Sequence, residues 1–308
     1  MLAIVCPGQG SQTPGFLAPW KDLPGVADLL AEFSEIAGLD VLAHGTDSDE
    51  ETIKDTAVAQ PLIVAAGLVS ASALQLDDVA ADATIVAGHS VGEITAAALA
   101  GVLTTAEAAH LVRVRATGMA EASNAAPTGM AAVLGGDQDA VLEAIAGHGA
   151  AAANVNGAGQ IVAAGTTEAI AALAAAPPAS ARVIPLKVAG AFHTEFMADA
   201  VPALQDYVST LSPADPQRHL LSNRDGAVVG SGAEVLSRLV DQVTRPVRWD
   251  LCMEALGAAG VTGILEVLPG GTLTGLAKRG LKGTATLAIK KPEDLDKAAD
   301  FIAEHTAS

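Results

Sequence analysis

A serine at position 90 stands in the pattern best suited to chemistry in this chain. Residues 88–92 read Gly-His-Ser-Val-Gly, between the apolar run 84–87 and the helix-forming run 93–100. A strand, a tight Gly-x-Ser-x-Gly turn and a helix are together typical of a nucleophile elbow, which exposes the serine oxygen above a helix N-terminus. We therefore expect acyl transfer through Ser90. The alternative is that Ser90 only caps the following helix.

A serine hydroxyl needs a base within hydrogen-bond reach before it attacks an acyl group. Among the seven histidines, His193 is the best candidate, because it lies between an expected strand and an expected helix, at a junction that can hold a side chain rigidly. His89 neighbours Ser90, but consecutive side chains diverge on a sharp turn, so we expect a structural role for it. The remaining histidines fall in loops or on helix faces, where solvated or paired imidazoles are commoner than catalytic ones.

Two further features fit an acyl-transfer site. A tetrahedral oxyanion needs two N–H donors; Val91 offers one, and the glycine-rich segment 7–12, which follows the first expected strand, could offer another. Arg113 and Arg115 lie in an otherwise apolar helix with no acidic residue four positions away. A buried guanidinium there would need a carboxylate, and a substrate could provide it.

The elements that must position these residues indicate an α/β fold. Residues 1–120 alternate short apolar strands with helices, which predicts a parallel sheet. We expect the apolar run 61–69 to be a buried helix, because polar residues follow from position 70 and the run falls short of a membrane span. Thr105 is expected to cap the next helix, which would end near residue 122.

The middle of the chain has a different order of elements. Strand 130–134, helix 138–147, strands 151–155 and 160–164, helix 167–175 and strand 182–186 follow one another, with Asn156-Gly157 as the hairpin signal. This βαββαβ order predicts a ferredoxin-like subdomain inserted into the body. We then expect helices at 196–211, 233–243, 250–259, 272–280 and 293–304, an extended segment at 220–223, and strands at 263–267 and 286–289.

The length of 308 residues suits one large domain with an insertion. We place the catalytic body at 1–124 and 190–308 and the subdomain at 125–189. The net charge of −18 argues against nucleic acid and against an anionic membrane surface as partners. Two cysteines without framework spacing and an N-terminus that reads as a first strand fit a cytoplasmic protein without disulfides.

These motifs together resemble the malonyl-CoA:acyl carrier protein transacylase family. The matching segments span nearly the whole chain in order: 7–12, 60–61, 88–93, Arg115 with Met119, 190–193, 222–223, 246–249, 266–270 and 273–276. The family's fold, an α/β-hydrolase-like body with a ferredoxin-like insert, agrees with the element order above.

The resemblance implies a role for individual residues. Ser90 would form the acyl ester, and His193 would be the general acid and base. The backbone carbonyl of Gln242 would orient the histidine in place of an acidic third member. Gln9 and Val91 would donate their backbone N–H groups to the oxyanion.

The resemblance also implies how the acyl group is chosen. Arg115 would pair with the free carboxylate of a malonyl group, and Met119 accompanies it in the motif. Phe192, beside the acyl pocket, would crowd a branched α-carbon, which favours malonyl over methylmalonyl. One methyl group in an apolar pocket is worth only about 1–3 kcal/mol, so this preference is modest.

The implied reaction is ping-pong transfer of malonyl from malonyl-CoA to the phosphopantetheine thiol of acyl carrier protein, by a monomer that uses no metal or other cofactor. An acidic carrier would need a local basic patch on this acidic chain, and the candidates are Lys187, Lys278, Arg279 and Lys282. A serine esterase or thioesterase would share Ser90 and His193 but would have no use for Arg115. A catalytically silent carrier-binding scaffold is the non-enzymatic alternative. Fatty-acid and polyketide acceptors both remain open.

Overall fold

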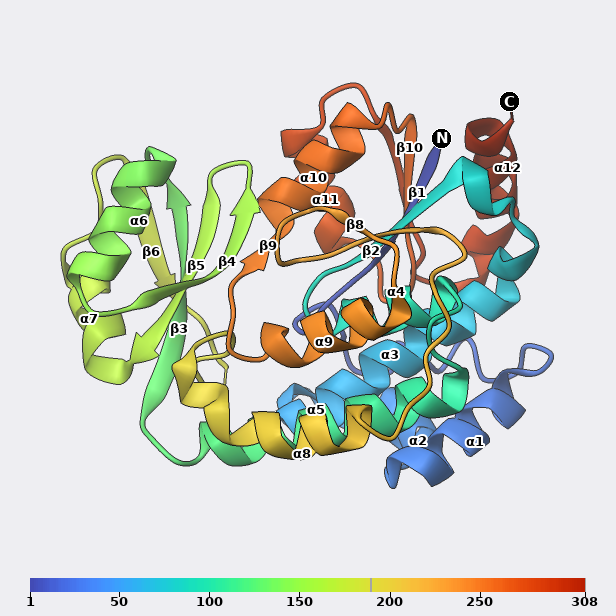
Figure 1. The fold of residues 1–308 in the computed structure, drawn as a ribbon, viewed down its shortest axis with the longest axis horizontal. Helices are drawn as coiled ribbons and strands as arrows, with labels where there is room; N and C mark the ends of the chain where they lie inside the picture. The colour runs from blue at the N-terminus through green and yellow to red at the C-terminus, as the bar shows by residue number, and fades with distance from the viewer. Residues whose placement is uncertain (189, 308) are drawn as a thin grey trace.

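Six strands form the main sheet of this computed structural model, which describes residues 1–188 and 190–307 (Figure 1). Their order is β11 (Ala285–Ala288), β10 (Gly263–Glu266), β1 (Leu2–Cys6), β2 (Thr84–Gly88), β7 (His219–Leu221) and β8 (Val228–Val229). All neighbours run parallel except β8, which is antiparallel to β7. The central strand β1 is buried along its whole length, as expected for a parallel sheet covered on both faces.

Helices cover both faces of this sheet. The larger hydrophobic cluster packs Ile4 of β1 and its neighbours against one group of helices: α1 (Val26–Ala37), α2 (Val41–Thr46), α3 (Thr56–Ala73), α4 (Gly92–Leu99), α5 (Thr105–Ser123), α8 (Val201–Val208), α9 (Gly232–Gln242) and α12 (Leu295–Thr306). The other cluster packs Val5 against α10 (Trp249–Ala258) and α11 (Thr272–Gly280). Short 3-10 turns lie at Thr52–Lys54, Leu76–Asp78, Ala81–Ala83, Glu195–Ala200 and Pro292–Asp294.

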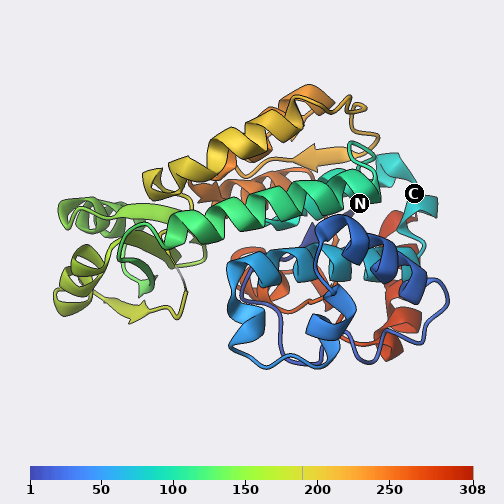
Figure 2. The ribbon, with the colours of Figure 1, turned by 90° about the horizontal axis from the view of Figure 1, so that it is seen from below.

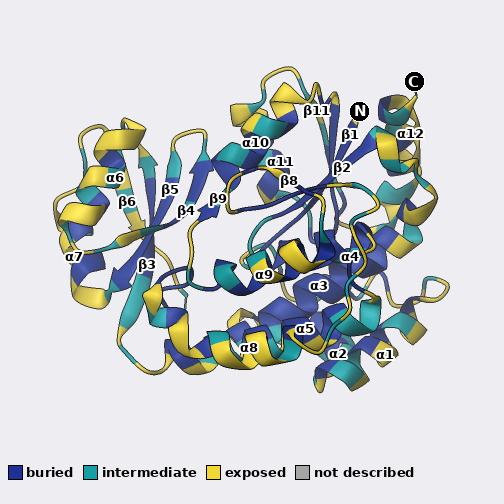
Figure 3. Cartoon of the chain, in the orientation of Figure 1, coloured by how far each residue is buried: buried dark blue, intermediate teal, exposed yellow. Residues whose placement is uncertain are grey.

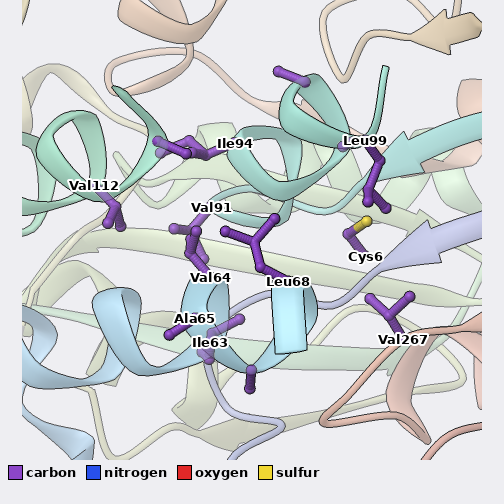
Figure 4. Close-up of a cluster of buried hydrophobic side chains, with 14 of the residues drawn as sticks. Cys6, Ile63, Val64, Ala65, Leu68, Val91, Ile94, Leu99, Val112 and Val267 are labelled. Carbon is purple, nitrogen blue, oxygen red and sulfur yellow. The ribbon is translucent and has the colours of Figure 1, made fainter. Parts of the chain in front are cut away.

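Helix α3 is the most deeply buried of the long helices (Figure 3). By length and composition alone it could cross a membrane, but 78% of its apolar stretch is buried inside the fold. Figure 4 shows Val64 and Leu68 of α3 close to Val91 and Ile94, beside the start of α4. The predicted buried helix is therefore confirmed, and it lies under the turn that carries Ser90.

The second sheet has the order β6-β3-β5-β4-β9 and forms the lobe on the left of Figure 1. Its elements are β3 (Thr128–Gly135), α6 (Gln138–Gly147), β4 (Ala151–Gly157), β5 (Gln160–Thr166), α7 (Thr167–Ala175) and β6 (Ala181–Pro185). The four strands from β3 to β6 are antiparallel and enclose a hydrophobic cluster of their own. The predicted ferredoxin-like plan is thus confirmed.

Strand β9 (Val247–Arg248) was not predicted. It comes from the segment between α9 and α10 and pairs in parallel with β4, so a body segment completes the sheet of the lobe. Figure 2 shows the long helix α5 leading from the body towards this lobe. The boundary expected at residue 189 and the chain end at 308 lie outside the described residues.

Several local predictions were wrong by a few residues. The hairpin turn lies at Ala158 and Gly159, not at Asn156-Gly157, because these two residues adopt the left-handed conformation that a tight hairpin turn needs. Thr104, not Thr105, caps α5, and it forms a capping box with Glu107. The helix expected at 196–211 is a 3-10 turn followed by α8, which begins beside a proline and ends at Val208.

Gly88 at the end of strand β2 and Gly92 at the start of helix α4 allow the backbone to pack closely at this turn. A Cβ added at Gly88 would lie 2.1 Å from the carbonyl carbon of Gly92, and a Cβ added at Gly92 would lie 2.2 Å from the carbonyl oxygen of Cys6. Both contacts are with backbone atoms, which cannot move aside as a side chain can. The turn between strand and helix therefore requires glycine at both ends.

Gly92→Ala should consequently lower the free energy of unfolding by about 3 kcal/mol, the upper range for overpacking a rigid interior. Urea denaturation checks this. Gly275→Ala is the matched control, because a Cβ there meets nothing within 4 Å inside α11. The control should gain about 0.5–1 kcal/mol from helix propensity. Equal effects of the two substitutions would contradict the prediction.

Candidate active site

Ser90 lies at the tip of the turn between β2 and α4, in a strained backbone conformation. Its φ is 54°, in the left-handed region that non-glycine residues rarely adopt. Its N–H donates to Oδ1 of Asn223 at 2.8 Å, and the Asn223 amide group in turn donates to the carbonyl of Gly88 at 2.6 Å. Asn223 therefore holds the turn at two points, and these buried hydrogen bonds maintain the strained conformation of Ser90.

His193 completes a hydrogen-bonded pair with Ser90. Nε2 of His193 lies 2.7 Å from Oγ of Ser90, and Nδ1 lies 2.8 Å from the carbonyl oxygen of Gln242. Because a carbonyl only accepts, Nδ1 carries the hydrogen and Nε2 is free to accept from the serine hydroxyl. His193, with φ of 61°, shares the left-handed conformation of Ser90.

The imidazole of His193 is neutral in this site. It is 4% exposed. Burial first, and then the positive charge of Arg115, lower the pKa of His193 from 6.5 to about 3. At any pH well above this value Nε2 is unprotonated, so its lone pair is available to the Ser90 hydroxyl.

Arg115 extends from α5 to the same serine. The guanidinium is buried and donates from Nη2 to Oγ of Ser90 at 3.3 Å and to Oε1 of Gln242 at 2.9 Å, and from Nη1 to Oε1 of Gln60 at 2.6 Å. Within the described residues no carboxylate lies within the 4.0 Å of a salt bridge from this guanidinium. Burial lowers the pKa of Arg115 to about 10, so it stays charged at neutral pH.

Ser90 and His193 line a cavity of about 170 Å³ between the body and the inserted lobe. Arg115 is not among the described residues that line it, and its guanidinium reaches the site through Oγ of Ser90. From the body come Gln9, Gln60, Ser90, Met119, Phe192 and His193. From the lobe and the segment after β6 come Met130, Asn154, Val162, Leu186, Lys187 and Val188. The structure thus brings the predicted Ser90, His193, Phe192 and Met119 to one cavity.

The glycine-rich segment after β1 packs directly against the elbow. A Cβ added at Gly8 would lie 2.6 Å from the carbonyl oxygen of His89, and the His89 N–H donates to Cys6 at 2.9 Å. No hydrogen bond among the described residues engages the N–H of Gln9 or of Val91. Both donors are therefore available to a ligand, and their role as oxyanion donors stays a prediction.

The predicted carrier-docking residues do not all lie at the cavity. Lys187 lines the cavity, whereas Lys278, Arg279 and Lys282 are exposed at and just beyond the end of α11, outside the cavity lining. Arg279 donates to Gln160 of the lobe at 3.3 Å. His89, expected to be structural, lies 2.9 Å from Oδ1 of Asn156 on β4.

Four side chains of the site have contacts that were not predicted from the sequence: those of Gln60, Asn223, Glu93 and Gln242. Glu93 is buried in the first turn of α4 and accepts from the N–H of Asn223 at 2.5 Å and from Nε2 of Gln242. A usable signal existed for Asn223, because it follows the apolar run of β7, and the carboxyl ends of adjacent parallel strands share one edge.

The comparisons with known proteins agree with this geometry. The family model of the acyl transferase domain matches residues 3–289. The malonyl CoA-acyl carrier protein transacylase of Mycobacterium tuberculosis is 52% identical over 302 residues, which cover 98% of this chain and 100% of the relative. This chain belongs to that family of acyltransferases. The family predicted from the sequence motifs is therefore confirmed.

Solved structures of the family extend the match to three dimensions. A crystal structure of MCAT from Mycobacterium tuberculosis superposes with a TM-score of 0.93 at 52% identity, covering 97% of this chain and 99% of that one. A malonyl-transacylase solved in complex with a type II PKS acyl-carrier protein superposes with a TM-score of 0.89 at 31% identity, again covering 97% and 99%. The α/β body and its ferredoxin-like lobe are the family fold.

The depressed pKa of His193 makes a prediction for stability. Between pH 6.5 and 3 the unfolded chain protonates this histidine and the folded chain does not, so stability falls as the pH falls. The slope from this one group is about 1.4 kcal/mol per pH unit near pH 5. Urea denaturation of the wild type and of His193→Gln at pH 7, 6, 5 and 4.5 should show the steeper loss in the wild type. Parallel curves would show that His193 is not kept neutral.

Proposed function

We propose that this chain transfers a malonyl group from malonyl-CoA to the phosphopantetheine thiol of acyl carrier protein through an ester on Ser90. The observation that carries the proposal is that one hydroxyl contacts two groups: Oγ of Ser90 lies 2.7 Å from Nε2 of His193 and 3.3 Å from Nη2 of Arg115. A base and a carboxylate-binding cation therefore meet at one nucleophile. The names of the relatives, which are malonyl CoA-acyl carrier protein transacylases, support the same acyl group.

The first half-reaction forms the ester. His193 Nε2 accepts the hydroxyl proton as Oγ attacks the thioester carbon. The N–H groups of Gln9 and Val91 receive the oxyanion, each worth about 3 kcal/mol of barrier. When the tetrahedral intermediate collapses, the C–S bond breaks, and the CoA sulfur takes the proton from His193.

The second half-reaction runs the same steps in reverse. The carrier thiol gives its proton to His193 and attacks the Ser90 ester carbon. The C–O bond then breaks, and the proton returns to Oγ, so the enzyme is regenerated. The carbonyl of Gln242 holds the imidazole through both halves, and the proposed chemistry requires no metal or other cofactor.

Arg115 selects the acyl group in this proposal. Its guanidinium is positively charged and buried, and no carboxylate of the described residues pairs with it, so the free carboxylate of malonyl would supply the missing counter-ion. Phe192 and Met119 line the cavity beside Ser90, where they would limit the space around the α-carbon. A serine esterase would use Ser90 and His193 without any need for this cation.

Mass spectrometry tests the function and its specificity together. The wild type incubated with malonyl-CoA should gain one malonyl mass on Ser90, and Ser90→Ala should gain none. Arg115→Met keeps the apolar bulk but removes the charge, so malonyl loading should fall by about 100-fold or more while acetyl loading changes little. Equal losses for the two acyl groups would favour the esterase. An unmodified wild type would favour a carrier-binding scaffold.

We further propose that an acidic carrier docks on the basic residues of the cavity and of the end of α11. Lys187 lines the cavity itself, and Lys278, Arg279 and Lys282 form a second exposed group at and beyond the end of α11. On a chain with a net charge of −18, such local groups are the surfaces that can attract an acidic protein. A fatty-acid carrier and a polyketide carrier would meet the same surface. We also propose that the enzyme is a cytoplasmic monomer.

Charge reversal tests the docking surface. Lys278→Glu with Arg279→Glu should raise the KM for the carrier by about tenfold at low salt and less at high salt, because exposed charges are screened. The rate of malonyl-CoA hydrolysis should stay the same, since neither residue lines the cavity. Steady-state kinetics with varied carrier concentration provides the measurement. An unchanged KM would remove α11 from the docking surface.

A further inference from the structure

A carboxylate lies behind the active site that the proposed mechanism does not use. Glu93 is 6% exposed, and its two oxygens accept from two different partners. Oε1 accepts from the N–H of Asn223 at 2.5 Å, and Oε2 accepts from Nε2 of Gln242. Each partner in turn contacts Ser90, Asn223 through its side-chain oxygen and Gln242 through Nε2, which donates to the Ser90 carbonyl at 3.2 Å.

The amide of Gln242 separates two buried charges of opposite sign. Its Nε2 faces the carboxylate of Glu93, and its Oε1 accepts from Nη2 of Arg115 at 2.9 Å. A carboxylate only accepts and a guanidinium only donates, so the amide has one acceptable orientation between them. Glu93 lies close enough to Arg115 for its charge to raise the pKa of that residue, but the two do not form a direct ion pair.

Other charges also face Glu93. The positive charge of Arg238 on α9 lowers the pKa of this carboxyl. On α10, burial and then the charge of Glu93 raise the pKa of the Cys252 thiol. Burial raises the pKa of Glu93 to about 7, and it outweighs the hydrogen bonds from Asn223 and Gln242 and the charges of Arg115 and Arg238, which lower that pKa. Burying this carboxylate therefore costs free energy of desolvation, and an exposed ion pair could hold α4 at a smaller cost.

We propose that Glu93 is a positioning residue that fixes the Gln242 amide, so that Arg115 is held in place by neutral acceptors and keeps its positive charge for the carboxylate of the acyl group. This inference rests on the proposed function. In it, Glu93 never touches the substrate. It balances the buried cation from a distance, and Gln242 prevents the salt bridge that would occupy Arg115.

The substitution Glu93→Gln tests whether Glu93 sets the orientation of the Gln242 side-chain amide. The oxygen of the new side chain would stay with the Asn223 N–H, so its NH2 group would face the NH2 group of Gln242. Gln242 would have to turn over, and its NH2 group would then oppose the Arg115 guanidinium. The ratio of kcat/KM for malonyl loading to that for acetyl loading should fall about tenfold, as expected for a lost hydrogen bond to a charged group.

Simple electrostatics predicts the opposite result, which makes the test sharp. Removing a negative charge near Arg115 would by itself attract the malonyl anion and raise the ratio. An unchanged or raised ratio would therefore overturn the proposal. Asp241→Asn is the matched control, because Asp241 precedes Gln242, is 45% exposed and pairs with Arg224, and its ratio should stay within about twofold.

The double variant Glu93→Gln with Gln242→Glu keeps the test decisive if the single variant unfolds. It keeps the net charge and gives the carboxylate introduced at position 242 two donors, the new amide and Arg115. That carboxylate would occupy Arg115 directly, so the malonyl-to-acetyl ratio should stay about tenfold or more below wild type. A wild-type ratio would refute the proposal, and thermal melts verify folding.

The two hypotheses fail in different ways. If the wild type gains no malonyl mass on Ser90, the proposed function fails, whatever the variants do. If the wild type is loaded and the variants keep its ratio, only the role of Glu93 fails.

Discussion

A buried guanidinium that pairs with no carboxylate of the described residues is the constraint on which the rest of this site depends. Arg115 is 2% exposed, and two glutamine oxygens and the Ser90 hydroxyl accept from it. Neutral acceptors compensate only part of the cost of burying a charge. Under the proposed function the remainder would make the site selective, because a ligand with a carboxylate beside Arg115 would recover energy that an uncharged acyl group cannot.

The same charge sets the chemistry of the base. Arg115 disfavours a second positive charge on His193, which is part of the reason for its low pKa. A histidine with such a pKa is a weak base when the cavity is empty of anions. A bound malonyl carboxylate would offset the charge of Arg115 and so strengthen the base when the substrate is in place. An uncharged acyl group would lack this effect, so selectivity would act on the rate as well as on binding.

The sequence revealed those parts of the molecule whose signals are local. The elbow glycines, the element order of the lobe and the buried α3 are patterns within short segments. Residue type and position indicated His193 and Arg115 as candidates, and the family motifs implied their roles. The roles of Asn223, Glu93 and the side chain of Gln242 were not predicted, because the contacts that join Asn223 and Gln242 to Ser90 and Glu93 span more than 100 residues of sequence. Strand β9 was also not predicted, because its two residues are too few to show the alternation of apolar and polar residues that indicates a strand.

The strained backbone at the site explains why that long-range network is needed. Ser90 and His193 both have positive φ, a conformation that costs about 1–3 kcal/mol for a residue other than glycine. A turn of this kind relaxes unless its surroundings fix it. Asn223 binds the N–H of Ser90, and Gln242 binds its carbonyl and the ring of His193. The carboxylate of Glu93 joins these two partners, so one buried acid ties the nucleophile, the base and the cation into a single arrangement.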